Sequence, residues 1–402
     1  MKINLDIAKL LKRIGLTFVA LCIFYYVFLL CAYFIPSRFI MDNWHESVNS
    51  IASETKRWEV IPNIVGTKLD TFTDNLIFQK LHNNDRLNPF QAAVWNNGYF
   101  RYWMGDIPIL RFLLVFMSYT GIRYLNIFVI FGLFVAVMHQ LQQTISSVFA
   151  GLFALVLFMI HFWIFPLSLQ YTPVYVILMV AILWLTWMKK QDKLNLNNVV
   201  FTSFVIGSVT NYFDLLTAPL LTFAIPFFVW YVLRHQNEIA AFLTVFTETI
   251  FMGLAWLLGY AGTWVAKWAV GSIILQENLF QSAIQQIFLR TSGTEGEVLA
   301  YSEILKKVLG AMFPTYVWPI LLFVMIALVI VGVLSKGFTM HKLLNHSVLL
   351  MMSVVPFVWF FILQNHNQHH YYFTYRNLAI TVLGIFTYLY VMIDWSKWFR
   401  RS

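Results

Sequence analysis

Charged residues are scarce in this 402-residue chain, where Asp, Glu, Lys and Arg together make up 11% of the sequence. A typical soluble domain has about a quarter of its residues charged. Hydrophobic residues reach 60% of the chain, and 39 of them are Phe. This composition excludes an ordinary soluble enzyme, an intrinsically disordered chain and a collagen-like fibre.

Cysteine and the common cofactor-binding motifs are also missing or nearly so. The only two cysteines, Cys22 and Cys31, lie in the first apolar run, so the sequence indicates no disulfide scaffold. It contains no Gly-rich phosphate-binding loop, no dinucleotide fingerprint, no HExxH and no paired CxxC. We therefore expect neither ATP-driven transport nor nicotinamide chemistry. No cofactor is predicted, although a divalent metal remains open.

Long apolar runs are the main feature that is present. A transmembrane helix needs about 20 mostly apolar residues, and ten runs approach this length. They lie at 14–35, 123–141, 146–165, 172–188, 198–213, 217–233, 246–272, 316–335, 347–363 and 378–394. The first run is too long for the core of a signal peptide, so we expect a retained anchor. The prediction is an all-α, polytopic membrane protein of about ten transmembrane helices, forming a single transmembrane domain over 1–402.

The distribution of Lys and Arg predicts the orientation, because short cytoplasmic loops are enriched in these residues. Thirteen of the 27 Lys and Arg residues lie in or beside the segments that this orientation places in the cytoplasm, which are 1–13, 142–145, 189–197, 234–245, 336–346 and 395–402. Both termini are then cytoplasmic. The net charge of +9 faces anionic lipid and is no indication of nucleic-acid binding.

Two long segments, 36–122 and 275–315, fall on the outer side. In the first, the apolar run 107–119 is too short to cross the membrane and has Pro108 near its start, so we predict a re-entrant or interfacial helix. In the second, apolar residues recur at helical spacing and predict amphipathic helices on the membrane surface. A flexible turn at 291–298 is expected to join them.

Three outer carboxylates are candidates for a catalytic base. Asp70 and Asp74 stand four residues apart and share a face if their segment is helical. Two carboxylates this close either raise the pKa of one or bind a cation, and such a pair suits a base for an acceptor hydroxyl. Equally, Asp70 fits a helix N-cap and Asp74 a first helical turn. Asp214 ends a predicted span, where an unpaired charge costs about 2.5–3.5 kcal/mol, so it is either functional or a cap of the following turn.

Basic and aromatic residues near the outer surface are candidates for substrate binding. Arg101, Trp103 and Arg111 flank or enter the run 107–119, and a cluster of this kind suits a lipid phosphate and a sugar ring. Lys267 lies near the outer end of a long span. Interfacial anchoring and snorkelling explain the same residues without a ligand.

The segment 364–377 is predicted to be the most polar short outer turn. It holds His366 and His370, and Tyr375 stands beside Arg376, whose guanidinium suits a bidentate phosphate contact. No acidic residue or cysteine lies beside the histidines, so no metal site is predicted there. Interfacial anchoring by Tyr and Arg is the alternative. Glu248, near the cytoplasmic end of a span, is expected to be solvated.

The arrangement resembles the GT-C fold of integral-membrane glycosyltransferases, in which a first span leads into a large outer loop with an acidic residue. The stretch NNGYFRYWMG…ILRFLL is also similar to uncharacterised multi-spanning proteins of low-GC Gram-positive bacteria. This resemblance implies a bacterial plasma-membrane enzyme that takes a sugar from a polyprenyl-phosphate-linked donor. The acceptor is then an envelope glycan or polymer. It implies Asp70 or Asp74 as base or metal ligand, 107–119 as a surface helix, and Arg376 with the His-rich turn as donor-phosphate contacts.

Three other functions remain open at this point. A polysaccharide polymerase or ligase also uses lipid-linked sugars, but generally has its large outer loop late in the chain. A transporter or flippase of lipid-linked substrates favours internal repeats and broken helices at mid-membrane, and the sequence has no such repeat. A purely structural membrane partner is the third alternative.

Overall fold

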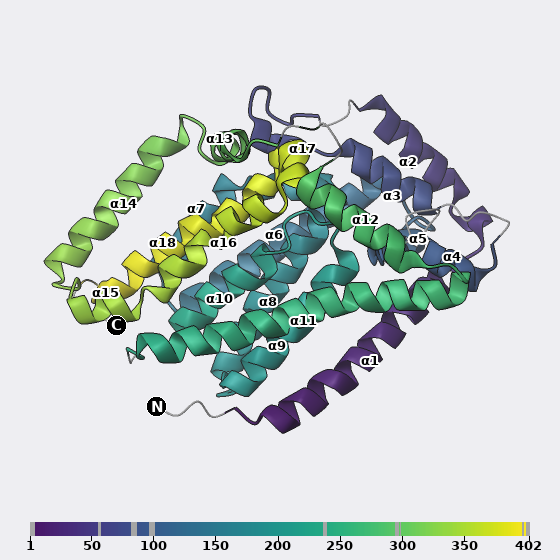
Figure 1. Ribbon diagram of the computed structural model, residues 1–402. Coiled ribbons are helices and arrows are strands. Elements are labelled where there is room, and N and C mark those ends of the chain that lie inside the picture. The colour runs from purple at the N-terminus through teal and green to yellow at the C-terminus, as the bar shows by residue number, and fades with distance from the viewer. Residues whose placement is uncertain are drawn as a thin grey trace.

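The computed structural model describes residues 5–54, 58–81, 87–95, 101–235, 239–293, 297, 299–395 and 398. Every named element in these ranges is a helix, as Figure 1 shows. The all-α prediction is therefore confirmed.

Seven helical segments in the described part of the chain are long and apolar enough to cross a membrane. Five are single helices, namely α1 (Ile7–Tyr33), α6 (Tyr119–Thr144), α8 (Thr172–Lys190), α11 (Phe242–Leu275) and α14 (Val317–Leu334). Two are composite: Met340–Ile362 joins α15 (Met340–Asn345) to α16 (Val348–Ile362), and Gln364–Met392 joins α17 (Gln364–Thr374), η5 (Tyr375–Asn377) and α18 (Leu378–Met392). These segments support a multi-pass membrane protein.

Three further helices complete the predicted set. They are α7 (Ser147–Met159), α9 (Leu196–Phe213) and α10 (Leu221–Arg234). Each of the ten predicted runs thus contains a helix, and α7 and α10 are apolar but shorter than a typical span. The number of helices that cross the bilayer stays a prediction.

Polar residues just before several helices explain where they begin. The side chains of Asp6, Ser146 and Asn195 accept hydrogen bonds from backbone N–H groups three residues later, at 3.1, 3.1 and 3.0 Å. Each bond pairs one of the four N–H groups that the first turn of a helix leaves without an acceptor.

Two glycines allow α9 and α11 to approach at backbone distance. The backbone oxygen of Trp256 occupies the space where a Cβ on Gly207 would lie, and the backbone oxygen of Phe204 does the same at Gly259. Small residues at helix interfaces permit close packing in membranes, where lipid is as apolar as the side chains. The backbones of α9 and α11 are therefore in direct contact at these two positions.

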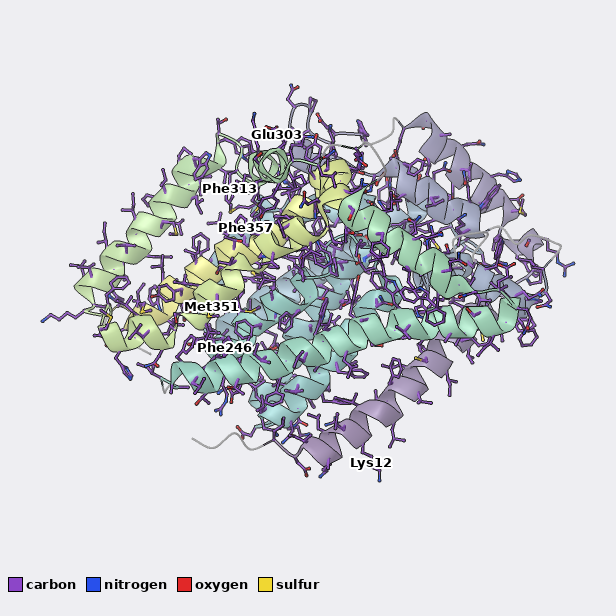
Figure 2. All side chains as sticks on the ribbon, viewed as in Figure 1. Lys12, Phe246, Glu303, Phe313, Met351 and Phe357 are labelled. Atoms are coloured by element: carbon purple, nitrogen blue, oxygen red, sulfur yellow. The ribbon has the colours of Figure 1, made fainter. Side chains whose placement is uncertain are left out.

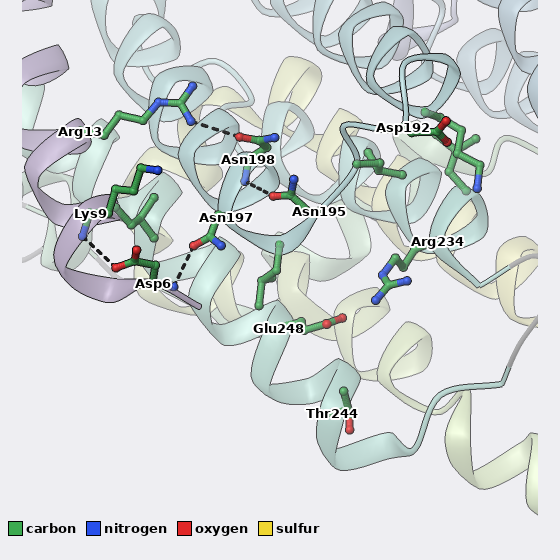
Figure 3. A pocket seen from close by; sticks show the side chains of 15 residues that line it. Asp6, Lys9, Arg13, Asp192, Asn195, Asn197, Asn198, Arg234, Thr244 and Glu248 are labelled. Atoms are coloured by element: carbon green, nitrogen blue, oxygen red, sulfur yellow. Dashed lines mark hydrogen bonds between the residues drawn. The ribbon is translucent and has the colours of Figure 1, made fainter. Parts of the chain in front are cut away.

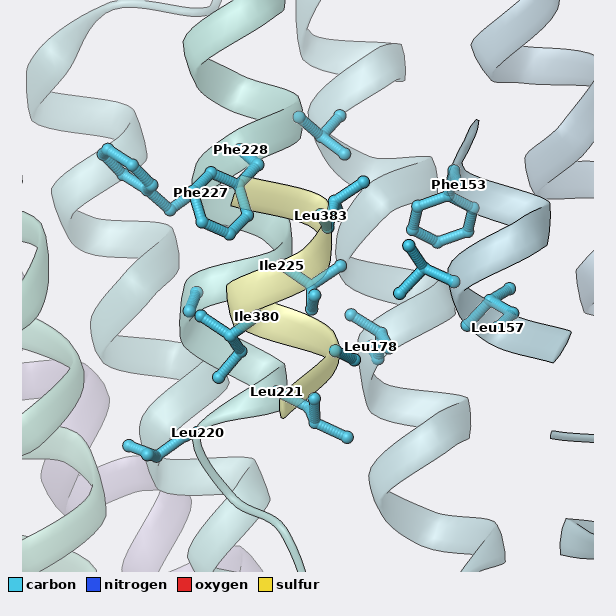
Figure 4. Packing of buried hydrophobic residues seen from close by; sticks show 14 of the residues in the cluster. Phe153, Leu157, Leu178, Leu220, Leu221, Ile225, Phe227, Phe228, Ile380 and Leu383 are labelled. Atoms are coloured by element: carbon cyan, nitrogen blue, oxygen red, sulfur yellow. The ribbon is translucent and has the colours of Figure 1, made fainter. Parts of the chain in front are cut away.

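The main core lies between α7, α8, α10 and α18. Phe153, Leu178, Ile225 and Leu383 come from these four helices and are all at most 2% exposed, and Figure 4 shows them converging. In a bilayer the gain from such packing is mostly van der Waals contact. The core holds the helices whose outer ends carry the polar cluster described below.

The outer segments form a layer of short helices at one end of the molecule. They are α2 (Met41–Ser53), α3 (Thr71–Leu81), α4 (Pro89–Trp95), α5 (Asp106–Leu113), α12 (Leu279–Ser292) and α13 (Tyr301–Met312). The two amphipathic helices predicted in 275–315 are present as α12 and α13. Part of the turn predicted at 291–298 lies outside the described residues.

The helix predicted at 107–119 is shorter than expected. It ends at Leu113, and the chain turns before Tyr119 starts α6. The apolar composition continues through the turn, so the composition alone did not reveal the break. Ile107 and Arg111 are buried, whereas Phe112 is exposed.

The segment 364–377 was wrongly predicted to be a turn. It is helical throughout, as α17 and η5, with a kink at His370, and it leads directly into α18. Most of its polar side chains are buried, including Asn365, Asn367 and Asn377. Packing against the outer layer, which its composition does not reveal, keeps this polar segment helical.

The predicted cytoplasmic segments meet at the opposite end. Asp6 N donates to Asn197, Lys190 to Gln140, and Phe242 N to Asn345. Figure 2 places Lys12 at this end and Glu303 at the end that carries α17. The polar segments therefore divide between two ends as predicted. Which end faces the cytoplasm stays a prediction.

Candidate functional site

Arg376 is a buried cation at the outer end of the bundle, where η5 packs against the loops that flank α7 and α3. Its side chain is 1% exposed. Its Nε donates to the Ile160 carbonyl at 3.2 Å and its Nη2 to the Gly66 carbonyl at 3.1 Å, while Nη1 has no hydrogen-bond partner among the described residues. The guanidinium lies 4.2 Å from the ring centre of Tyr171. Among the described residues no carboxylate forms an ion pair with it, so its charge is suited to an anion.

Asp70 brings a carboxylate into the same region. The Tyr372 hydroxyl of α17 donates to Asp70 Oδ2 at 2.7 Å. The N–H and the hydroxyl of Thr73 also donate to the Asp70 carboxylate, at 3.3 and 2.9 Å. The Thr73 N–H contact is that of a helix N-cap, the role that the sequence left open for Asp70. Asp70 is also within electrostatic range of Tyr171, the residue beneath Arg376.

His161 and Tyr375 complete this group, which we call the Arg376 cluster (Asp70, His161, Tyr171, Tyr372, Tyr375 and Arg376). The Tyr375 hydroxyl lies 2.8 Å from His161 Nδ1 and 3.0 Å from the Gly66 carbonyl oxygen. His161 is held with φ +57°.

A cavity of about 420 Å³ lies on the outer side of this cluster. Its lining includes Gly66, whose carbonyl binds Arg376, and two exposed lysines of α13, Lys306 and Lys307. Glu303 is the single carboxylate among its described lining residues. The cavity thus presents positive charge near the buried guanidinium. The backbone at Gly66 separates the two.

Asp74 accepts hydrogen bonds from a different set of donors than Asp70, but the two carboxylates are close enough to interact electrostatically. Tyr119 donates to its Oδ2 at 2.5 Å, and Ser168 Oγ and the backbone N–H groups of Leu169 and Gln170 donate at 3.2, 3.2 and 3.3 Å. Burial raises the pKa of Asp74 to about 6, and the Tyr119 hydrogen bond opposes this shift. Asp74 fastens α3 to α6 and to the loop before α8.

Asp106 is a candidate that the sequence analysis missed. It begins α5, is 8% exposed, and among the described residues no side chain donates a hydrogen bond to its carboxylate. Burial raises the pKa of Asp106 to about 7; hydrogen bonds from the backbone N–H groups of Asp106 and Ile107 oppose this shift, and the negative charge of Asp74 adds to it. A carboxyl whose pKa lies near neutrality is well suited to exchange a proton. Its position at the start of a short apolar run was the only signal in the sequence.

Asp214 and two of the histidines meet at the turn between α9 and α10. Asp214 accepts hydrogen bonds from Thr217 N at 2.9 Å and from Tyr260 at 3.4 Å, and burial raises its pKa to about 6. His366 donates from Nε2 to the Leu216 carbonyl at 2.8 Å. His370 lies next to Arg290, with 3.3 Å between Nε2 and Nη1. The contacts of Asp214 are those of a capped turn.

Two other predicted cations, Arg111 and Lys267, donate hydrogen bonds to backbone carbonyls at the C-terminal ends of helices. Arg111 donates to the carbonyls of Ala32, Ile35 and Leu81, which end α1 and α3. Lys267 donates to the Val94 carbonyl near the end of α4 at 2.9 Å. Cations stabilise helix C-termini, so both side chains have structural partners.

Arg101 and Trp103 lie near Lys267. Trp103 is fully buried, donates to the Thr263 carbonyl at 2.8 Å, and packs its ring 5.2 Å from Lys267 Nζ. Arg101 contacts Ser282 of α12 at 3.4 Å. The predicted site residues thus divide into separate groups, and only Asp70, Tyr375 and Arg376 share the Arg376 cluster.

Within the described ranges, no three His, Cys, Asp or Glu side chains lie close enough together to hold a metal ion. No family model, curated protein or solved structure matches the chain.

Proposed function

We propose that this protein is a membrane glycosyltransferase of GT-C type, which moves a sugar from a polyprenyl-phosphate-linked donor to an envelope glycan or polymer at the extracytoplasmic face. The observation that supports this most directly is the buried Arg376, which among the described residues has no ion-pair partner and no acceptor for its Nη1, close to a cavity that carries Lys306 and Lys307. A protein rarely buries a charge without a partner. A donor phosphate would supply the missing anion.

The roles follow from the chemistry of such a transfer. The acceptor oxygen forms a bond to the anomeric carbon while the bond from that carbon to the phosphate oxygen breaks, with inversion. Arg376 and the two lysines stabilise the charge that develops on the departing polyprenyl phosphate. The acceptor proton passes to a carboxylate. Asp106 is the best suited for this, because side chains already donate hydrogen bonds to Asp70, Asp74 and Asp214, whereas no described side chain donates to Asp106.

Binding of the donor requires an opening of the outer layer. Arg376 and Asp70 are at most 2% exposed, and the segment that contains Gly66 lies between them and the cavity. We therefore expect the donor to displace this segment, as substrates displace the loops that cover many active sites. Closure over the bound donor would then exclude water, which otherwise competes as acceptor.

The test is a mass-spectrometric comparison of envelope glycans from the source cell, a deletion strain and rescued strains. Rescue uses the wild type, Asp106→Asn, Asp70→Asn, Asp74→Asn or Arg376→Lys. Loss of one sugar substituent on deletion, restored by the wild type and not by stably expressed Asp106→Asn or Arg376→Lys, supports the proposal. A change in polymer length in place of a lost substituent indicates a polymerase or ligase.

A matched pair of double variants controls for charge. Lys306→Gln with Lys307→Gln removes two positive charges at the outer cavity and should reduce transfer. Lys12→Gln with Lys193→Gln removes two exposed charges at the opposite end and should not. Glycans that are unchanged by deletion would overturn the proposal and direct attention to transport of lipid-linked substrates.

A further inference from the structure

A second and larger cavity lies at the opposite end of the bundle, which is predicted to face the cytoplasm. Its volume is about 740 Å³, and it is enclosed by the start of α1, the segment between α8 and α9, the end of α10 and the start of α11. Figure 3 shows charged and amide side chains on several of its walls. Small-molecule sites typically occupy about 300–1,000 Å³. The volume therefore suits a ligand the size of a phosphorylated sugar or polyol.

The wall formed by α1 suits an anion. Lys9 and Arg13 stand four residues apart and so share one face of this helix. Arg13 Nη1 donates to Asn198 Oδ1 at 3.1 Å, and its guanidinium lies 3.6 Å from the ring centre of Phe201. These contacts fix the guanidinium in place and leave other N–H groups for a ligand. In the described part of the chain no carboxylate lies within ion-pair distance of Lys9 or Arg13.

The wall formed by α11 offers a hydrogen-bond acceptor, which suits a ligand that carries a donor group. Glu248 was expected to be solvated, but it is only 5% exposed, and within the described ranges its Oε2 has no hydrogen-bond partner. Arg234 is close enough to stabilise its charge electrostatically. A buried carboxylate oxygen without a partner is costly, so a donor group from a ligand would remove that cost.

We propose that this cavity binds a phosphate ester that carries hydroxyl groups. Lys9 and Arg13 contact the phosphate, and a ligand hydroxyl donates to Glu248. The chemistry is shared by two sources: the headgroup of a glycerophospholipid in the adjacent leaflet, and a soluble phosphorylated polyol. The site is separate from the Arg376 cluster and does not depend on the proposed transferase activity.

The experiment measures binding to the full chain in nanodiscs made of phosphatidylcholine alone, with glycerol 3-phosphate and inorganic phosphate as probes. We expect saturable binding of glycerol 3-phosphate that is about tenfold tighter than that of inorganic phosphate, because one hydrogen bond to a charged group gives about this factor. Glu248→Gln should remove this preference while inorganic phosphate still binds. Lys9→Gln with Arg13→Gln should weaken both probes.

A second experiment distinguishes a lipid headgroup from a soluble phosphate ester as the ligand. In nanodiscs with phosphatidylcholine and phosphatidylglycerol at about 4:1, a lipid-headgroup site retains phosphatidylglycerol in native mass spectra and loses its affinity for glycerol 3-phosphate. A site for a soluble ester binds the probe equally well in both compositions. Either result supports the proposal.

The control variant, Lys12→Gln with Lys193→Gln, removes the same charge at the same end from residues that do not line the cavity. It should bind like the wild type. The proposal is overturned if neither experiment shows saturable binding, or if the control and the Lys9 and Arg13 variant lose binding equally. Thermal unfolding of each variant establishes that it is folded.

Discussion

Replacement of Asp106 by Asn should make the protein more stable at neutral pH. The carboxylate of Asp106 is buried at the start of α5, and among the described residues no side chain donates a hydrogen bond to either oxygen. Burial raises its pKa from 3.8 to about 7. The folded protein therefore holds a proton at this site over a range of pH in which the unfolded chain has released it.

The sign and size of the effect follow from this linkage. Between about pH 4 and pH 7 the folded state binds more protons than the unfolded state, so stability falls as the pH rises through this range and is constant above it. A shift of about three pKa units corresponds to roughly 4 kcal/mol. Asn has no charge at any pH, so the variant avoids this loss. We expect equal stability of the two proteins below about pH 4, and an advantage of up to about 4 kcal/mol for Asp106→Asn at pH 8.

The assay is equilibrium unfolding in mixed micelles with increasing sodium dodecyl sulfate, followed by tryptophan fluorescence at several values between about pH 4 and pH 8. The measured quantity is the difference in free energy of unfolding between the variant and the wild type. Asp42→Asn, at an exposed site in the first turn of α2, is the control for loss of a carboxylate. A difference for Asp106→Asn that does not change with pH, or a less stable variant at pH 8, would refute the reasoning.

Three further predictions test other parts of the structure. Gly207→Ala should lower the free energy of unfolding by about 2 kcal/mol or more, because the new Cβ meets the backbone of α11. Gly151→Ala, which has open space around it, should raise the free energy of unfolding by about 0.5–1 kcal/mol. The same unfolding assay measures both variants, and equal effects would contradict the packing of α9 on α11. Asp74→Ala leaves three buried donors without an acceptor, Ser168 Oγ and the N–H groups of Leu169 and Gln170, and leaves Tyr119 with only the Leu167 carbonyl; it should cost about 3–5 kcal/mol. A neutral result in that assay would exclude a role for Asp74 in holding these elements together. With both native cysteines replaced, Lys307→Cys should react with a membrane-impermeant maleimide on intact cells and Lys193→Cys only after lysis; the reverse pattern would invert the predicted topology.

The helices were predictable because apolar run length is a direct physical requirement of crossing a bilayer. All ten predicted runs contain helices. The errors arose where composition and structure diverge. Polar residues in 364–377 were interpreted as a turn, yet tertiary packing buries them in α17 and η5. Similarly, the apolar run 107–119 continues through a turn that ends α5 at Leu113.

The site was less predictable because its residues meet only in the fold. Asp70 and Tyr372 are separated by 302 positions in sequence, and no local spacing connects them. Asp70 and Arg376 were identified separately, from residue type and expected depth. Asp106 was missed because the feature that distinguishes it, the absence of a described side-chain donor to its buried carboxylate, depends on what packs around it. Arg111 was interpreted as a phosphate ligand because a sequence does not show which helix ends lie within its reach.

The length of α11 has a consequence for the surrounding lipid. Its 34 residues span about 51 Å, whereas the hydrocarbon core of a bilayer is about 30 Å thick. The C-terminal part of α11 is held by two hydrogen bonds, in which Lys267 donates to the Val94 carbonyl and Trp268 donates to the Arg101 carbonyl. Close contact with α9 at Gly207 and Gly259 further fixes its inclination. A helix held in this way does not retilt when bilayer thickness changes, so the lipid next to it has to stretch or compress, at a cost of a fraction of a kcal/mol per Å of mismatch.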